Sequence, residues 1–353
     1  MLGGHEGQPL VVKNTMYVVT PWPNVLYAFD LTQEGYPLRW KYRPDVSPNS
    51  IGVACCDSIN RGAFYADGKI IYNLLDGHTV AVDADSGREI WKTKIAEVAA
   101  GETTTIAPLV VRDRVIVGAA GGEFGIYGWV KALNLKDGQI LWTAHNIGPD
   151  AGMLVHADTF KPPYDSGADL GARSWANDSW KVGGAPVWGW MAFDPELDLI
   201  YYGTGNPAPY NPEQRVGDNK WSSSVLARRP EDGALVWAYQ FTPHDNWDYD
   251  STGAMILADR ALARRGCVRA RELGEVGGSG QRPAGVRAGQ ADRGVQRQCE
   301  RHLSESRRRG ESGLAGRVLT PDASFLHVDQ QPVHGLRGVA RLAPERNALR
   351  RRG

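Results

Sequence analysis

The chain has 353 residues, of which 42% are apolar, so it is long enough for one large domain or two ordinary ones with a sizeable core. Its 40 basic and 40 acidic residues balance, which argues against a nucleic-acid partner or an acidic membrane surface. The four cysteines show no CxxC pair or Cys/His spacing, which argues against zinc, and the lack of an apolar run of ~18 residues excludes a membrane-spanning helix.

Residues 1–259 contain a repeat. A small residue is followed two positions later by Asp or Asn, then by a turn glycine, and a Trp ends the next apolar strand. The small residues are Ala28, Ala81, Ala132 and Ala227, and the tryptophans are Trp40, Trp91, Trp142 and Trp237. The tryptophans are 51, 51 and 95 residues apart, so the last interval covers about two repeats.

Short alternating apolar runs lie within each repeat, such as 10–12 with 16–19 and 109–111 with 115–117, and these predict hairpins. Four short antiparallel strands in a repeat of roughly 40–50 residues are typical of propeller blades. The predicted fold class is therefore all-β, a β-propeller that is incomplete because only about five blades are recognisable. An unrelated antiparallel sandwich is the alternative.

Cys55 and Cys56 are adjacent. Neighbouring cysteines can form a disulfide only through a strained ring with a distorted peptide, so such a bridge is rare. Two small buried thiols are the other interpretation, and spacing alone favours them.

A glycine-rich turn with one carboxylate, Gly121-Gly122-Glu123-Phe124-Gly125, follows Thr105 by one hairpin. Glycines allow a flat ligand to approach the backbone closely, and the acid can point at a cation. Taken alone, the pattern also fits an ordinary hairpin turn.

Residues 242–250 are rich in carboxylate and amide side chains between Trp247 and Tyr249. If this segment is extended, Asp248 and Asp250 lie on one face, where a hard cation could bind both. A solvated acidic loop is the alternative.

Together these motifs resemble the PQQ-dependent (quinoprotein) methanol and ethanol dehydrogenases, most closely the lanthanide-dependent methanol dehydrogenases. The resemblance covers residues 5–259, and its motifs occur in the family's order. They are His5-Glu6-Gly7-Gln8-Pro9-Leu10, Cys55-Cys56-Asp57 with Asn60-Arg61-Gly62, Trp188-Gly189-Trp190, Gly203-Thr204-Gly205-Asn206-Pro207-Ala208-Pro209, and Pro243-His244-Asp245 with Trp247-Asp248-Tyr249-Asp250.

The resemblance implies an eight-bladed propeller that binds pyrroloquinoline quinone (PQQ). It places a Cys55–Cys56 disulfide on one face of the quinone and the Trp188 indole on the other. It also implies that the rim of the cofactor, with its three carboxylates, is held by Glu6, Arg61, Thr105, Ala120, Gly121 and Gly122.

The resemblance further implies a metal site and a catalytic base. Glu123 and Asn206 match metal ligands, and Asp248 matches both a ligand and the base that takes the alcohol proton. Asp250 is the position that separates lanthanide from calcium enzymes in the family. Three carboxylates with one neutral amide balance a trivalent lanthanide better than Ca²⁺, so a lanthanide is favoured.

The function implied is periplasmic oxidation of a small primary alcohol to the aldehyde, with electrons passed to a cytochrome c. The resemblance also allows a homodimer, and it implies no nucleic-acid partner and no membrane span. The alternatives are a non-catalytic propeller scaffold, a membrane-bound glucose-type quinoprotein and an inactive truncated fragment. Met1-Leu2-Gly3-Gly4 does not form a signal peptide pattern.

Residues 260–353 differ from the part before them. Residues 1–259 contain 20 basic and 31 acidic residues, whereas 260–353 contain 20 arginines, no lysine and 9 acidic residues. This tail offers no family motif and no apolar period. We expect it to be disordered or translated out of frame, since an Arg/Gly-rich, lysine-free stretch is typical of a GC-rich gene read in the wrong frame. A basic arm for nucleic acid is the alternative.

Overall fold

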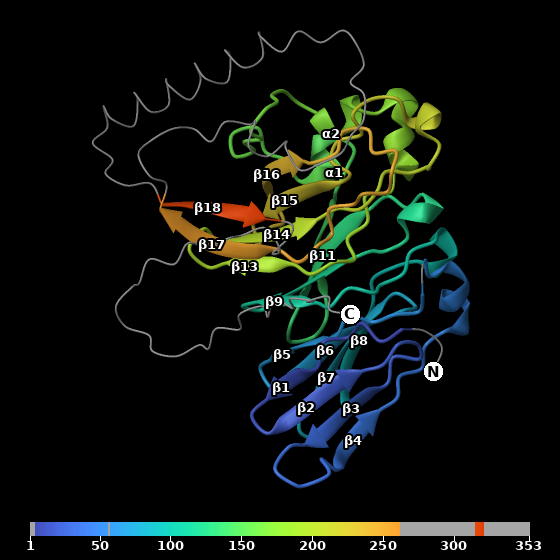
Figure 1. Cartoon of the computed structure of the whole chain (residues 1–353), viewed down its shortest axis with the longest axis vertical. Coiled ribbons are helices and arrows are strands. Elements are labelled where there is room, and N and C mark those ends of the chain that lie inside the picture. Colours follow the sequence, from blue (N-terminus) through green and yellow to red (C-terminus); the bar gives the residue numbers. More distant parts are fainter. Residues whose placement is uncertain (1–3, 56, 262–314, 321–353) are drawn as a thin grey trace, which may run out of the picture. The chain divides into compact units, whose positions relative to one another are not determined.

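The computed structural model describes residues 4–55, 57–261 and 315–320. The regular structure in this part of the chain is mostly strand (Figure 1). Four antiparallel sheets of four strands each follow one another along the sequence, and a two-stranded sheet comes after them. This arrangement agrees with blades of a propeller, because each sheet is built from consecutive hairpins.

The four sheets are called blades 1 to 4. Blade 1 consists of β1 (Leu10–Val12), β2 (Thr15–Val19), β3 (Leu26–Asp30) and β4 (Leu38–Tyr42). Blade 2 consists of β5 (Ala63–Ala66), β6 (Lys69–Leu74), β7 (His78–Asp83) and β8 (Glu89–Lys94). Blade 3 consists of β9 (Leu109–Val111), β10 (Arg114–Gly118), β11 (Trp129–Asn134) and β12 (Ile140–His145). Blade 4 consists of β13 (Ala192–Asp194), β14 (Leu199–Gly203), β15 (Ser224–Arg228) and β16 (Leu235–Gln240).

The small residue of each repeat lies opposite the tryptophan on the neighbouring strand. The pairs are Ala28 with Trp40, Ala81 with Trp91, Ala132 with Trp142, and Ala227 with Trp237. In every blade the register shifts directly after this alanine, as it does at a β-bulge. The alanine leaves room for the indole, and the bulge increases the local twist of the outer strand.

Three of these tryptophans dock onto the next blade. A Cβ added to Gly87, Gly138 or Gly233 would lie 2.7 Å from the indole of the preceding blade. Each indole also donates its Nε1–H to a carbonyl of the next blade, in the pairs Trp40 to Ala84 (3.2 Å), Trp91 to Leu135 (3.2 Å) and Trp142 to Pro230 (3.0 Å). The turn glycine of the repeat is therefore the surface on which the preceding tryptophan packs.

The cores lie between successive blades. Val80 and Val82 of blade 2 pack with Leu26 of blade 1, and Ile71 on the opposite face of the same sheet packs with Val115 of blade 3. Further clusters join blade 3 to blade 4 and blade 4 to Met255. Strands that bury both of their faces between two blades are largely apolar, as in β6.

The helices are short and lie in connecting segments. They are α1 (Asp150–Met153), α2 (Leu170–Arg173) and the 3₁₀ turns η1 (Pro48–Val53), η2 (Val98–Ala100), η3 (Gly122–Phe124), η4 (Ala176–Val182) and η5 (Pro212–Arg215). Both α1 and α2 belong to the connection between blades 3 and 4, and α1 packs against β12. Within the described residues, no helix has the length and apolar character needed to cross a membrane.

The last sheet pairs β17 (Ile256–Ala261) with β18 (Ala315–Thr320) in antiparallel register. The strand β17 therefore runs through the boundary expected at residue 259. The rest of the expected tail, at 262–314 and 321–353, lies outside the described residues.

Candidate cofactor and metal site

Arg61 brings together three residues expected at the cofactor rim. Its backbone N–H donates to the carbonyl of Thr105 (3.1 Å), and its Nη1 donates to the Thr105 hydroxyl (2.9 Å). Its Nη2 lies 3.1 Å from a carboxylate oxygen of Glu6. The Arg61 side chain is only 9% exposed, whereas that of Glu6 is 48% exposed. Burial lowers the pKa of Arg61, and the charge of Glu6 opposes this shift.

Two tryptophans lie beside this guanidinium. The central carbon of Arg61 is 4.7 Å from the ring centre of Trp188 and 5.9 Å from that of Trp190. Gly189 separates the two tryptophans and packs on the backbone carbonyl of Thr252, which would lie 1.7 Å from an added Cβ. The segment after Asp250 thus runs directly over the Trp188–Trp190 turn.

Buried polar atoms in this region lack partners. Nε of Arg61, Nε1 of Trp190 and Oδ1 of Asn206 are all buried and have no hydrogen bond to any described residue. Leaving such groups unpaired costs about 1–3 kcal/mol each. The two nitrogens require an acceptor and the oxygen requires a donor or a cation, so the site fits a bound anionic group beside a metal ion.

The glycine turn holds the backbone close to Asn206. Ala120 exchanges two backbone hydrogen bonds with Thr103 (2.8 and 3.1 Å), which fixes the start of the turn. Gly121 has φ +118°, and a Cβ added there would lie 2.1 Å from the Gly101 carbonyl. A Cβ on Gly122 would lie 2.7 Å from Oδ1 of Asn206. Glycine is required at both positions, and Glu123 follows in η3 at the same edge.

Asp250 is held beside Asn206. Its Oδ1 accepts a hydrogen bond from the backbone N–H of Asn206 at 2.5 Å. Burial and the nearby carboxylates of Asp248 and Glu123 together raise the pKa of Asp250 to about 7, against the lowering effect of the Asn206 N–H. The carboxylates of Asp248 and Glu123 therefore act electrostatically on that of Asp250, as expected of acidic residues around one metal site.

Asp248 lies on the exposed side of the same loop. Its Oδ2 accepts a hydrogen bond from the hydroxyl of Tyr210 at 3.4 Å. Burial raises the pKa of Tyr210, as do the charges of Glu123, Asp248 and Asp250. All three acidic residues expected at the metal therefore lie near one phenol.

The segment that contains Asp248 and Asp250 is not an extended strand. Both residues have left-handed backbone conformations, with φ of +62° and +56°. Tight turns rather than strand alternation therefore set their side-chain directions. In the part of the chain that the structure describes, no group of three or more His, Cys, Asp or Glu side chains converges closely enough to hold a metal by itself.

The buried carboxylate of Asp245 shapes this loop. It accepts hydrogen bonds from the backbone N–H groups of Trp247 (2.9 Å) and Tyr249 (3.0 Å) and from the hydroxyl of Ser223 (2.7 Å). Arg215 binds the carbonyl of Asp245 at 2.6 Å. The hydrogen bonds of Asp245 therefore fix the loop that carries Asp248 and Asp250.

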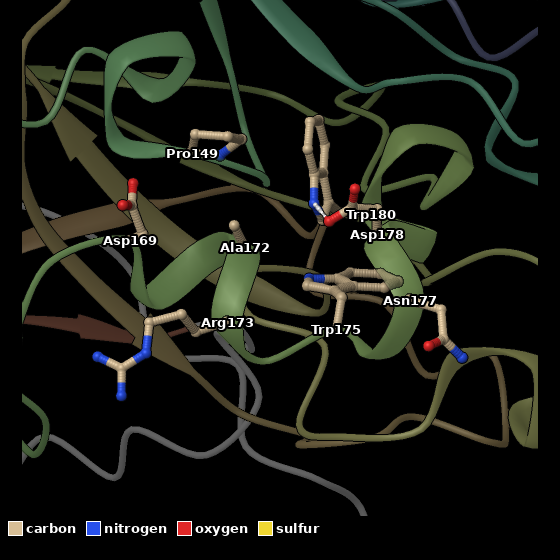
Figure 2. A pocket seen from close by; sticks show the side chains of 8 residues that line it. All are labelled: Pro149, Asp169, Ala172, Arg173, Trp175, Asn177, Asp178 and Trp180. Carbon is tan, nitrogen blue, oxygen red and sulfur yellow. Dashed lines mark hydrogen bonds between the residues drawn. The ribbon is translucent and has the colours of Figure 1, made fainter.

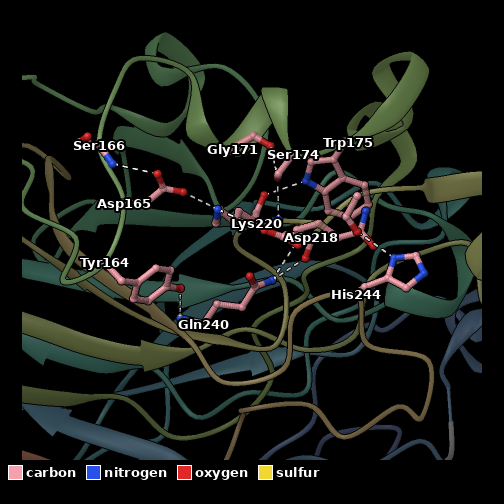
Figure 3. Close-up of polar contacts among 12 residues, drawn as sticks. Tyr164, Asp165, Ser166, Gly171, Ser174, Trp175, Asp218, Lys220, Gln240 and His244 are labelled. Carbon is pink, nitrogen blue, oxygen red and sulfur yellow. Dashed lines mark hydrogen bonds and ion pairs between the residues drawn. The ribbon is translucent and has the colours of Figure 1, made fainter. Parts of the chain in front are cut away.

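A polar network on the neighbouring segment fixes the start of the loop (Figure 3). Lys220 pairs with Asp165 at 2.5 Å and with Asp218 at 3.4 Å. Gln240 donates to the carbonyl of Asp218 at 2.8 Å, and Nδ1 of His244 lies 2.7 Å from the carbonyl of Gly217. His244 thus contacts the backbone of the neighbouring segment.

Over residues 3–267 the sequence matches the PQQ family of glucose, ethanol and alcohol dehydrogenase β-propeller domains. The chain belongs to this family. The match extends eight residues past the boundary that the sequence motifs indicated, and it confirms the predicted all-β propeller class against the sandwich alternative.

This quinoprotein is similar to lanthanide-dependent methanol dehydrogenases. It is 51% identical over 260 residues to that of Methylacidiphilum fumariolicum and 49% identical over 261 residues to that of Methylorubrum extorquens. These alignments cover 73% and 74% of this chain and 43% of each relative. The solved structure of a europium-containing methanol dehydrogenase aligns with a TM-score of 0.72 at 49% identity, covering 74% of this chain and 46% of that one. The chain thus spans less than half the length of the curated relatives it matches.

Not every expected site residue of the quinoprotein can be placed. Cys55 is disulfide-bonded, but Cys56 lies outside the described residues, so the expected pairing stays a prediction. Sequence reasoning did not single out Tyr210. In the sequence, Tyr210 is marked only by its position four residues after Asn206. Its proximity to Asp248 is evident only once the loop that carries Asp248 has folded back.

A surface pocket of the chain shares no lining residue with this site. It is lined by Pro149, Asp169, Ala172, Arg173, Trp175, Asn177, Asp178 and Trp180 (Figure 2). The indole of Trp175 donates to the carbonyl of Lys220 at 2.7 Å, and that of Trp180 donates to Asp178 at 3.3 Å. Its tryptophans therefore already have hydrogen-bond partners, in contrast to Trp190.

Proposed function

We propose that this chain binds PQQ and a lanthanide ion and oxidises a small primary alcohol, of which methanol is the first candidate, to the aldehyde. The observation that carries this proposal is the set of unpaired buried atoms: Nε of Arg61 and Nε1 of Trp190 call for an anion, and Oδ1 of Asn206 suits a cation. The similarity to lanthanide-dependent methanol dehydrogenases supports the same assignment.

The cofactor rim is the part of the proposal that rests on most contacts. Arg61 is held in place by Glu6 and Thr105, so its unpaired Nε–H can bind a carboxylate of PQQ without reorganisation of the side chain. The backbone at Ala120, Gly121 and Gly122 allows close approach. The Trp188 indole would cover one face of the quinone, and a Cys55–Cys56 disulfide the other.

The metal would be held by Glu123, Asn206, Asp248 and Asp250. Oxygen ligands of this kind suit hard cations. Three carboxylates and one amide balance a trivalent ion, and Asp250 adds the third negative charge. We therefore assign the site to a lanthanide in preference to Ca²⁺.

Asp248 is the proposed base for the alcohol. It is exposed, so a substrate hydroxyl can reach it, and it is positioned by the hydroxyl of Tyr210. Because the pKa of Tyr210 is raised, its phenol stays protonated and can only donate to Asp248. When bound, the quinone supplies the hydride acceptor and the metal polarises its carbonyl. Asp248 takes the proton that leaves the alcohol hydroxyl.

The acceptor and the compartment are also part of the proposal. Relatives from Paracoccus denitrificans and Methylorubrum extorquens, 44% and 43% identical, are named methanol dehydrogenase [cytochrome c] subunit 1. We propose a cytochrome c as electron acceptor and the periplasm as the location, where a disulfide at Cys55 is compatible with oxidising conditions.

The test separates binding from turnover. Fluorescence titration of the purified chain with PQQ measures cofactor binding, and dye-linked methanol oxidation with La³⁺ or Ca²⁺ measures activity. We expect PQQ binding and faster turnover with La³⁺. Asp248→Asn should abolish turnover while PQQ still binds. Faster turnover with Ca²⁺ would contradict the metal assignment, and failure to bind PQQ would overturn the proposed function.

A further inference from the structure

Trp190 is half-buried with its indole nitrogen fully enclosed, and it is not one of the four repeat tryptophans. It precedes β13, and its Nε1–H has no acceptor among the residues placed in the structure. An indole nitrogen can only donate, so a buried indole needs a partner. The docking tryptophans, such as Trp40, Trp91 and Trp142, each have a carbonyl partner on the next blade.

The environment of Trp190 specifies the kind of partner that is missing. Arg61 lies 5.9 Å from its ring centre, and the Nε of Arg61 is also buried and unpaired. Trp22 has an unpaired indole nitrogen as well, but no Arg or Lys lies over its ring within the described ranges. Two unpaired donors, one of them cationic, attract an anionic acceptor rather than a neutral one.

The neighbouring acid does not fill this role. Glu6 already engages Nη2 of Arg61, and its side chain is half exposed. The Thr105 hydroxyl accepts from Nη1. Nε of Arg61 and Nε1 of Trp190 are therefore the two buried nitrogens at this point that have no partner among the described residues.

We propose that Trp190 is a cofactor-binding residue whose indole N–H, together with Nε of Arg61, binds one carboxylate of PQQ. This inference rests on the proposed function, because PQQ supplies the carboxylate. It gives the second tryptophan of the Trp188-Gly189-Trp190 motif a role different from the first: Trp188 stacks on the ring, and Trp190 selects the charged rim.

The experiment compares PQQ with its trimethyl ester, which keeps the ring system and lacks the negative charges. Dissociation constants are measured by fluorescence titration for the unaltered chain and for Trp190→Phe. Because a hydrogen bond to a charged group is lost, PQQ binding should weaken by roughly tenfold or more. The dissociation constant of the trimethyl ester should be nearly the same for the unaltered chain and for Trp190→Phe. Any loss of affinity caused by the smaller phenylalanine ring would appear with both PQQ and the ester.

Trp91→Phe is the matched control, since Trp91 is buried and its indole donates to Leu135 rather than to a ligand. It should lower the thermal midpoint and leave PQQ affinity unchanged. A second variant, Trp190→His, keeps a ring N–H and should bind PQQ more tightly than Trp190→Phe.

The outcomes separate this inference from the proposed function. If the unaltered chain binds neither compound, the proposed function is wrong and the role of Trp190 is wrong with it. If the unaltered chain binds PQQ and Trp190→Phe binds it equally well, only the role of Trp190 is overturned. Equal losses for PQQ and ester, or equally weak binding by the Phe and His variants, would show that Trp190 acts by packing alone.

Discussion

The carboxylate of Asp250 illustrates how single residues in this site depend on a ligand. It is tied to the backbone of Asn206, and its charge is opposed by burial and by Asp248. Sequence alone marked Asp250 through its spacing from Asp248. Only the fold shows that it turns toward Asn206 while Asp248 turns toward Tyr210.

Removal of the Asp250 carboxylate should change metal preference. In Asp250→Ala the site loses one of its three negative charges, so we expect La³⁺ affinity to fall by roughly tenfold or more and Ca²⁺ affinity to fall less. Isothermal titration calorimetry on the PQQ-loaded chain measures both. Asp198→Asn, a surface carboxylate paired with Arg112, is the control. Equal losses for the two ions would contradict the charge argument.

His145 should make stability depend on pH. It is stacked on Tyr127 with ring centres 3.6 Å apart, and burial lowers its pKa below the ordinary 6.5. The unfolded chain therefore binds this proton more readily than the folded one. The free energy of unfolding should fall as pH decreases from about 6.5 toward the lower folded pKa, and should be unaffected by His145 above that range.

Urea unfolding at pH 7.5 and 5.5 tests this effect. His145→Phe keeps the ring stack and removes the titrating group, so its loss of stability between the two pH values should be smaller than that of the unaltered chain. His156→Gln, at an exposed position, should behave like the unaltered chain. The prediction fails if His145→Phe shows the same pH dependence as the unaltered chain.

At the scale of elements, the repeat stabilises the contacts between blades. Gly138 has φ +75°, and a Cβ there would lie 2.5 Å from the Thr93 hydroxyl and 2.7 Å from the Trp91 ring. Gly68 has nearly the same φ, +73°, but an added Cβ would have nothing within 4 Å. The two glycines share the backbone requirement and differ in packing.

Gly138→Ala should therefore destabilise the protein more than Gly68→Ala. Both substitutions incur the left-handed backbone penalty of about 1–2 kcal/mol. Only Gly138→Ala also displaces the docked indole, for which we expect about 1–3 kcal/mol more, as in overpacked cores. Denaturant unfolding with a common m-value measures the difference, and equal free energies of unfolding would show that the indole does not depend on this glycine.

At the scale of the whole molecule, the site joins segments from successive blades. Arg61 precedes β5 of blade 2, Thr105 and Glu123 flank strands of blade 3, and Trp188 and Asn206 flank strands of blade 4. A ligand that binds all of these should stabilise their mutual packing, since any ligand that binds only the folded state raises stability.

We expect PQQ with La³⁺ to raise the thermal midpoint in differential scanning calorimetry. At a ligand concentration 100 times the dissociation constant, the gain is about 2.7 kcal/mol. Arg61→Ala should remove most of the gain, whereas Arg112→Ala, at an exposed ion pair outside the site, should keep it. A midpoint that does not respond to the ligands in the unaltered chain would contradict a site that spans these blades.

The sequence by itself determined the strands, their grouping into blades and the choice of candidate site residues. These features are local: strand alternation, turn glycines, the Ala-to-Trp spacing and the short motifs around Cys55, Asn206 and Asp248 are all read within a few residues. The family match then confirmed the fold class.

Only the tertiary structure decided which turn glycine receives which tryptophan and which polar atoms lack a partner. Trp91 and Gly138 meet across two blades, and Arg61 meets Trp190 across 129 positions of the chain. Hydrogen-bond satisfaction depends on every neighbour in space, so an unpaired indole such as that of Trp190 cannot be recognised from spacing. The turn between Asp248 and Asp250 was likewise not foreseen. Their left-handed backbone is set by the loop that is held on Asp245 and not by the sequence of the two residues.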